Sequence, residues 1–104
     1  MQTSRIAQLR KLIENEPDEI FYPYALALEL YKQNKEEAFG LLEFVISKNP
    51  DYLPAYYQLG KVAIELQRVV QAKEYIEKGI VVADKQNELK TKSELSNLLF
   101  SIED

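Results

Sequence analysis

The sequence predicts an all-α fold, a short helical superhelix of about six antiparallel helices. Apolar residues recur at helical spacing along nearly the whole chain. Short breaks, two of them built around proline, divide these stripes into segments of helical length. Two of the helix pairs also match each other at a shift of 33 or 34 residues. Together these observations predict a stack of similar helix pairs, an α-solenoid.

The first expected helix covers residues 4–16 and ends at a proline. Its apolar stripe consists of Ile6, Leu9, Leu12 and Ile13. Proline disfavours the helical conformation in the residue before it, so the helix should end near Pro17. A second proline, Pro50, makes the same kind of break 33 residues later. The aspartates that follow these prolines, Asp18 and Asp51, are expected to cap the next helices.

Residues 19–50 and 53–86 each contain two further stripes, and residues 88–102 contain a last one. Polar breaks at Gln33-Asn34 and Gln67-Arg68 separate the two helices of each pair. The last helix starts either with Asn87 as its cap or with a capping box from Thr91 to Glu94. The stripe residues of these five helices, in chain order, are Leu26, Ala27 and Leu30; Ala38, Leu41, Leu42, Val45 and Ile46; Tyr56, Leu59, Gly60, Ala63 and Leu66; Ala72, Tyr75, Ile76, Gly79, Ile80 and Ala83; and Leu95, Leu98, Leu99 and Ile102.

Small residues mark where the helices of a pair should cross closely. Ala27 aligns with Gly60, and Gly79 lies inside the second helix of the second pair. A glycine inside a helix costs about 0.5–1 kcal/mol relative to alanine. Two such glycines therefore indicate a crossing that a larger side chain would block.

A period of 34 residues with two helices per unit is the pattern of the tetratricopeptide repeat (TPR). The chain resembles this family, including a class of short bacterial members, over residues 4–102. In the second unit the resemblance rests on Tyr56, Leu59, Gly60, Ala72, Ile76 and Gly79, and in the first unit on Leu26, Ala27, Leu30, Ala38, Leu42, Val45 and Pro50. Pro23, Ala63 and Asp84 depart from the family pattern.

The resemblance implies a single TPR-like domain over residues 1–104. Its parts would be an N-terminal helix at 4–16, repeat one at 19–50, repeat two at 53–86 and a C-terminal capping helix at 88–102. Two full repeats are fewer than the three that such stacks usually need. The flanking helices are therefore expected to complete the core.

Composition removes several classes of function. The 104 residues include no cysteine and no histidine, so a thiol nucleophile, a disulfide and the commonest general base are all absent. The net charge of −4 argues against nucleic-acid binding. The acidic residues are dispersed, so no metal or other cofactor is expected, and no enzyme activity. Charged residues interrupt every apolar stretch, which argues against a membrane segment and favours a cytoplasmic location.

The resemblance also implies a function, protein–protein interaction, because the first helix of each TPR pair lines a concave groove. The residues carried over to that groove are Tyr24, Leu28 and Tyr31 from the first unit, Tyr57, Gln58, Lys61, Ile64 and Glu65 from the second, and Ser93, Asn97 and Phe100 from the last helix. Such a strip suits a peptide or protein segment with aliphatic anchors. Two alternatives stay open: the tyrosines pack against the chain's own end helices, or the chain self-associates as a homodimer.

Overall fold

The computed structural model describes residues 4–103, and this part of the chain forms six α-helices without any strand. The helices are α1 (Arg5–Asn15), α2 (Phe21–Leu30), α3 (Lys35–Lys48), α4 (Leu53–Glu65), α5 (Val69–Lys85) and α6 (Leu89–Ile102). The all-α prediction is confirmed. No helix within residues 4–103 is both long enough and apolar enough to cross a lipid bilayer.

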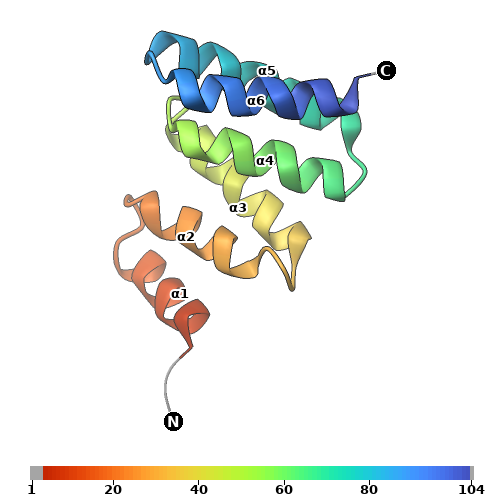
Figure 1. Ribbon diagram of the computed structural model, residues 1–104. Helices are drawn as coiled ribbons and strands as arrows, with labels where there is room; N and C mark the ends of the chain where they lie inside the picture. The colour runs from red at the N-terminus through yellow and green to blue at the C-terminus, as the bar shows by residue number, and fades with distance from the viewer. Residues whose placement is uncertain (1–3, 104) are drawn as a thin grey trace.

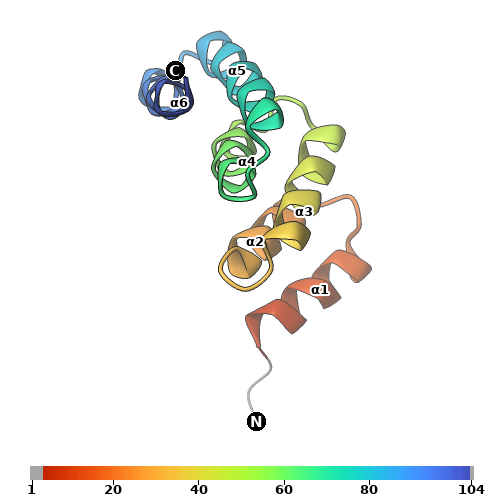
Figure 2. The same cartoon turned by 90° about the vertical axis from the view of Figure 1, so that its right-hand side faces the viewer.

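The helices form an elongated body of 48 × 28 × 20 Å, with α1 at one end and the pair of α5 and α6 at the other (Figure 1). Each helix packs against the next one along the chain, and α6 also contacts α4. Figure 2 shows two layers, with α2, α4 and α6 on one side and α1, α3 and α5 on the other. The stack bends toward the side of α2, α4 and α6. We call this side the concave face and the opposite side the convex face.

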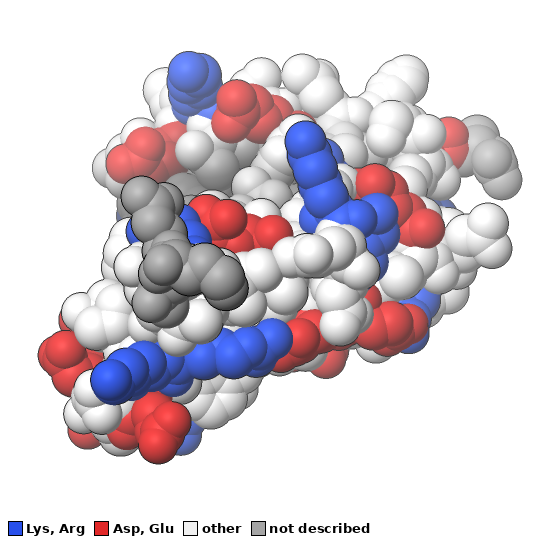
Figure 3. All heavy atoms as spheres, turned by 90° about the horizontal axis from the view of Figure 1, so that it is seen from below, with Lys and Arg blue, Asp and Glu red and all other residues white. Residues whose placement is uncertain are grey.

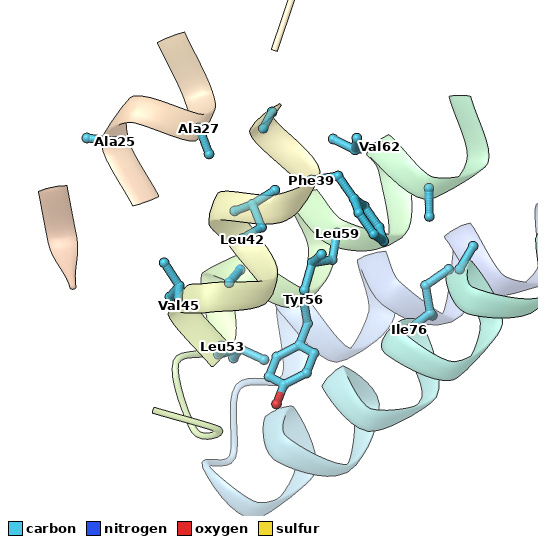
Figure 4. Packing of buried hydrophobic residues seen from close by; sticks show 14 of the residues in the cluster. Ala25, Ala27, Phe39, Leu42, Val45, Leu53, Tyr56, Leu59, Val62 and Ile76 are labelled. Atoms are coloured by element: carbon cyan, nitrogen blue, oxygen red, sulfur yellow. The ribbon is translucent and has the colours of Figure 1, made fainter. Parts of the chain in front are cut away.

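Buried apolar side chains form one continuous core along the stack. The largest fully buried side chains are Leu26, Leu42, Val45, Leu59, Val62, Ile76 and Leu95, which come from five of the six helices. Figure 4 shows residues of α3, α4 and α5 meeting in this cluster, with Tyr56 at its edge. The Tyr56 hydroxyl donates a hydrogen bond of 2.6 Å to the carbonyl oxygen of Pro50. Burying one such leucine contributes about 1.5–3 kcal/mol, so the fold is stabilised mainly by these inward faces.

Two glycines allow the helices of the second repeat to approach each other, as the sequence predicted. A Cβ atom added to Gly60 would lie 2.5 Å from Cγ1 of Ile76. One added to Gly79 would lie 2.6 Å from Cβ of Tyr56 and 3.0 Å from Cδ1 of Leu95. The separations of 2.5 Å and 2.6 Å are shorter than two carbon atoms tolerate. Hydrogen is therefore the only side chain that fits at either crossing without a shift of its neighbours.

The N-terminal caps differ from the prediction at both aspartates. The helix following Asp18 begins at Phe21, whose amide instead donates to the side chain of Glu19. Asp51 is also not a cap, because α4 has no side-chain cap. Its carboxylate lies 3.3 Å from Nζ of Lys85. Each aspartate comes too many residues before the first helical residue to reach the free amides of the first turn.

The two turns after α4 and α5 share one geometry that the sequence did not reveal. Gln67 and Asn87 adopt the left-handed conformation, with φ of 62° and 58°. The next amides, of Arg68 and Glu88, reach back to the carbonyl oxygens of Ala63 and Ala83. This is the Schellman arrangement that ends a helix. Both predicted starts of α6 are therefore wrong: Asn87 ends α5, and α6 begins at Leu89, before Thr91.

Replacing Gln67 by glycine is expected to stabilise the protein by about 0.5–1 kcal/mol. A left-handed conformation costs an L-residue about 1–2 kcal/mol, and the greater freedom of glycine in the unfolded chain offsets part of that gain. The measurement is the free energy of unfolding in urea. The control variant is Gln71→Gly, at an exposed site inside α5, which should be destabilised by about 0.5–1 kcal/mol. Equal destabilisation of both variants would contradict this account of the turn.

Exposed ion pairs connect neighbouring helices. Arg5 pairs with Glu29, and Arg68 pairs with Glu36. Figure 3, which views the molecule from the α1 end, shows basic and acidic side chains next to one another with uncharged surface between them. The surface on this side is therefore mixed in charge and not a field of a single sign.

The best-formed of these pairs joins α1 to α3. Arg10 donates two hydrogen bonds to Glu37, of 2.7 Å and 3.0 Å. The bond from Arg10 lowers the pKa of Glu37 below its usual value of 4.5. A carboxylate with a lowered folded-state pKa contributes stability above its unfolded pKa. It loses that contribution as the pH falls through the folded pKa.

Replacing Glu37 by glutamine should therefore destabilise the protein at pH 7 by less than about 1 kcal/mol, since both partners are partly exposed. The difference from the wild type should shrink at acid pH, once the pH has fallen through the lowered folded-state pKa of Glu37. Urea unfolding at the two pH values measures both differences. If Glu37→Gln lowers the free energy of unfolding by the same amount at both pH values, the charge of this ion pair contributes nothing to stability.

Candidate functional site

A hollow of about 510 Å³ is lined by residues from the N-terminal parts of the concave-face helices α2, α4 and α6. We call it the concave hollow. Its walls come from α2, α4, the turn after α5, and α6. Its lining residues are Tyr24, Leu53, Pro54, Tyr57, Gln58, Gln86, Glu88, Thr91 and Glu94. These residues combine aromatic and aliphatic surface with amide, hydroxyl and carboxylate groups.

Tyrosines form the apolar part of the concave hollow. Tyr24 is half-buried, and its ring forms a T-shaped pair with the Tyr52 ring at a centroid distance of 5.3 Å. Burial raises the pKa of Tyr24, and the neighbouring Tyr52 adds to this effect. The Tyr24 hydroxyl is therefore neutral at physiological pH and available as a hydrogen-bond donor. Tyr57 and Gln58 are also half-buried, so each keeps part of its surface open.

A second pair of predicted residues meets further along the same face. Nζ of Lys61 lies 4.8 Å from the ring centroid of Tyr31, and Nζ of Lys35 lies 5.4 Å from it. Contacts of this kind contribute about 0.5–1 kcal/mol at exposed sites. This contact joins α2 to α4 and gives this part of the concave face a positive charge.

The predicted groove residues thus fall into three groups. Tyr24, Tyr57 and Gln58 line the concave hollow, and Tyr31 and Lys61 contact each other beside it. The remaining predicted residues lie outside the hollow: Leu28, Glu65 and Asn97 are exposed, as are Ser93 and Phe100, and Ile64 packs against the core.

The sequence interpretation assigned other residues of α6 to the groove than those that line the hollow, and it missed the turn before α6. Thr91 and Glu94 line the concave hollow, whereas Ser93 and Asn97 were expected in this role. The signal was present in Leu95, the buried residue of α6. Thr91 and Glu94 precede it by four and one residues, so both flank the inward face. Glu88 precedes the first residue of α6, outside the helix positions that the family resemblance carried over.

The end helices leave the concave hollow open in the described part of the chain. α1 packs against α2 at one end of the stack, and α6 packs against α5 and α4 at the other. Among residues 4–103, no group of three or more acidic side chains is arranged to hold a metal ion. The chemistry that this face offers is recognition by apolar contact, hydrogen bonding and charge.

The convex face carries a second hollow, of about 700 Å³, between α3 and α5. Its polar groups are largely engaged with one another. The hydroxyl of Tyr75 donates to Glu43, and Nζ of Lys78 lies 5.8 Å from the Tyr75 ring centroid. Burial raises the pKa of Tyr75, with the hydrogen bond to Glu43 as the second cause. In this hollow the Tyr75 hydroxyl and the Glu43 carboxylate are thus already paired with each other.

Comparison with known proteins identifies the family. The model of the tetratricopeptide repeat matches residues 24–92, which is more than half of the chain. The chain belongs to the tetratricopeptide repeat family. TPR pairs stack into solenoids whose curvature creates extended concave binding surfaces. Protein interaction is therefore the general role of this fold.

Solved TPR structures agree with this assignment. The solution NMR structure of a tetratricopeptide repeat domain protein from Salinibacter ruber is 36% identical, with a TM-score of 0.77, covering 83% of this chain and 88% of that one. A crystal structure of a tetratricopeptide repeat domain protein from the same organism is also 36% identical, with a TM-score of 0.75, covering 80% and 93%. The predicted TPR superhelix is thus confirmed.

A more distant structure shows the same fold. The crystal structure of MamA is 21% identical, with a TM-score of 0.69, and covers 90% of this chain and 62% of that one. At this identity the likeness concerns the fold alone. A search of curated proteins finds no match to the chain.

Proposed function

We propose that this chain is a non-catalytic protein-interaction module that binds a peptide or protein segment on its concave face. The proposal treats the six helices as one unit, with α2–α3 and α4–α5 as the repeats and α1 and α6 as the flanking helices. The cysteine-free composition supports a cytoplasmic location for this activity. The likeness to Salinibacter ruber proteins supports a bacterial setting.

One observation carries the proposal. Three of the residues predicted from the sequence, Tyr24, Tyr57 and Gln58, line a single open hollow together with groups from α6. Tyrosine offers a large contact area and loses little rotamer entropy on binding, so it is common at recognition sites. The surface next to it adds a cation, Lys61, above the ring of Tyr31. The face thus combines apolar anchors with polar groups.

A pulldown from native cells tests this function. The wild-type chain should capture a defined partner, and both Tyr57→Ala and Lys61→Glu should reduce its recovery. The matched control is Val81→Ala on the convex face, where Val81 is 66% exposed. Its recovery should equal that of the wild type. Loss of the partner with Val81→Ala, and retention with the two concave-face variants, would contradict the proposal.

Self-association is the second candidate, and the exposed apolar side chains of α6 favour it. Leu89 and Phe100 are 71% and 70% exposed, and both lie on α6, in the helix pair that ends the described stack. Burying them against a second copy would remove apolar surface from water. Sedimentation equilibrium over a wide concentration range tests this. A dimer that dissociates when Phe100 is changed to serine would support self-association, and a monomer at every concentration would exclude it.

A further inference from the structure

We propose that the concave hollow receives a lysine or arginine side chain of the bound segment. This inference rests on the proposed function, because it concerns the same face, and it adds the chemistry of the partner. The occupant must have an apolar stem and a positively charged end. Both parts of this description come from the residues that line the hollow.

The floor of the hollow suits an aliphatic stem. Tyr24, Tyr57 and Leu53 supply aromatic and aliphatic surface from α2 and α4. Leu53 is buried, and the two tyrosines are half-buried. Lysine and arginine carry three or four methylene groups that pack along such surfaces while the charged end stays in a polar environment. The tyrosine rings also attract a cation through their faces.

The wall formed by α6 suits the charged end. Glu88 and Glu94 both line the hollow, and no lysine or arginine is among its lining residues. Within residues 4–103, neither carboxylate has a cationic nitrogen within 4.0 Å. Two lysines near this wall are engaged with other carboxylates. Nζ of Lys85 lies 3.3 Å from Asp51, and Nζ of Lys92 lies 2.7 Å from Asp84.

The helix dipole accounts for only one of the two carboxylates that line the concave hollow. Negative charge favours a helix N-terminus, which accounts for Glu88 beside the start of α6. Glu94 lies in the second turn of this helix, where that effect has faded. The helix dipole therefore does not explain its presence at the hollow. A positively charged group from a partner would complement it.

A random-peptide selection tests the inference. The full chain is used to select binders from a displayed library of 12-residue peptides, and the best binder is then measured by fluorescence anisotropy. We expect the selected peptides to be enriched in arginine and lysine relative to the unselected library. Changing the key basic residue of the best peptide to glutamine should weaken binding about tenfold.

Matched protein variants locate the effect. Glu88→Gln combined with Glu94→Gln should weaken binding of the basic peptide about tenfold and change binding of its glutamine version little. The control is Glu74→Gln combined with Glu77→Gln, which removes the same charge from exposed positions on α5. It should bind both peptides as the wild type does. All four sites are on the surface, so these variants are expected to fold.

The outcomes separate the two proposals. If binding depends on Tyr57 but shows no preference for a basic residue, the inference is wrong and the proposed function stands. The same conclusion holds if the Glu88/Glu94 and Glu74/Glu77 double variants bind the basic peptide equally well. If no peptide is enriched, or if the enriched peptides bind equally well to a folded Tyr57→Ala variant, both the inference and the proposed concave-face function are contradicted.

Discussion

Replacing Gly60 by leucine is expected to lower the free energy of unfolding by more than about 2 kcal/mol. A Cβ atom at this position already lies 2.5 Å from Cγ1 of Ile76 and 3.3 Å from Cδ2 of Leu98. The remaining carbons of leucine would have to enter the space where α4 meets both α5 and α6. These helices must then separate, and they lose packing along the core. Urea unfolding monitored by circular dichroism measures the loss.

Two variants serve as controls for Gly60→Leu. A Cβ added to Gly40, inside α3, meets nothing within 4 Å. Gly40→Leu is therefore expected to be neutral or stabilising, by up to about 1 kcal/mol, because leucine favours the helix. Tyr57→Ala should cost much less than Gly60→Leu, since Tyr57 keeps part of its surface open. A larger loss for Tyr57→Ala than for Gly60→Leu would contradict the assignment of faces on α4.

Truncation of Leu59 to alanine is expected to cost about 2–5 kcal/mol. Leu59 is fully buried, with 0% of its surface exposed, and it lies at the meeting of α3, α4 and α5 (Figure 4). Its neighbours belong to three different helices, so they cannot all move in to fill the cavity. The loss should appear as a lower midpoint of urea unfolding with an unchanged slope.

The control for Leu59→Ala is the same substitution at Leu28. Leu28 is 43% exposed on α2, so its truncation removes little buried surface and should cost less than about 1 kcal/mol. Similar losses for the two leucines would mean that the core does not run through α4 as described. If truncation of Leu28 lowers the free energy of unfolding more than truncation of Leu59 does, the assignment of Leu59 to the core and of Leu28 to the surface is contradicted.

Much of the fold could be predicted from the sequence because helical periodicity reports burial directly. Leu26, Leu42, Leu59 and Ile76 were assigned to inward faces by spacing alone, and all four are buried. Gly60 was also informative, because a glycine inside a helix needs a reason such as close approach. The prolines correctly predicted where α1 and α3 end, but the predicted aspartate caps were wrong. The turns after α4 and α5 depend on residues in the left-handed conformation, and neither of these residues is a glycine.

The site was predicted less completely than the fold. The strip on α2 and α4 followed from the repeat, and Tyr24, Tyr57 and Gln58 do line one hollow. The acidic wall did not follow, because the residues that the resemblance carried over from the last helix were Ser93, Asn97 and Phe100. The hollow is lined instead by Thr91 and Glu94 of α6 and by Glu88, which precedes the helix.

The central claim is that partners bind on the concave face. Site-specific photocrosslinking in living native cells tests it most directly, with a benzophenone amino acid placed at Tyr57 or, on the convex face, at Val81. We predict one discrete crosslinked species from position 57 that is absent, or much weaker, from position 81. A species that forms from position 81 and not from position 57 would contradict the claim.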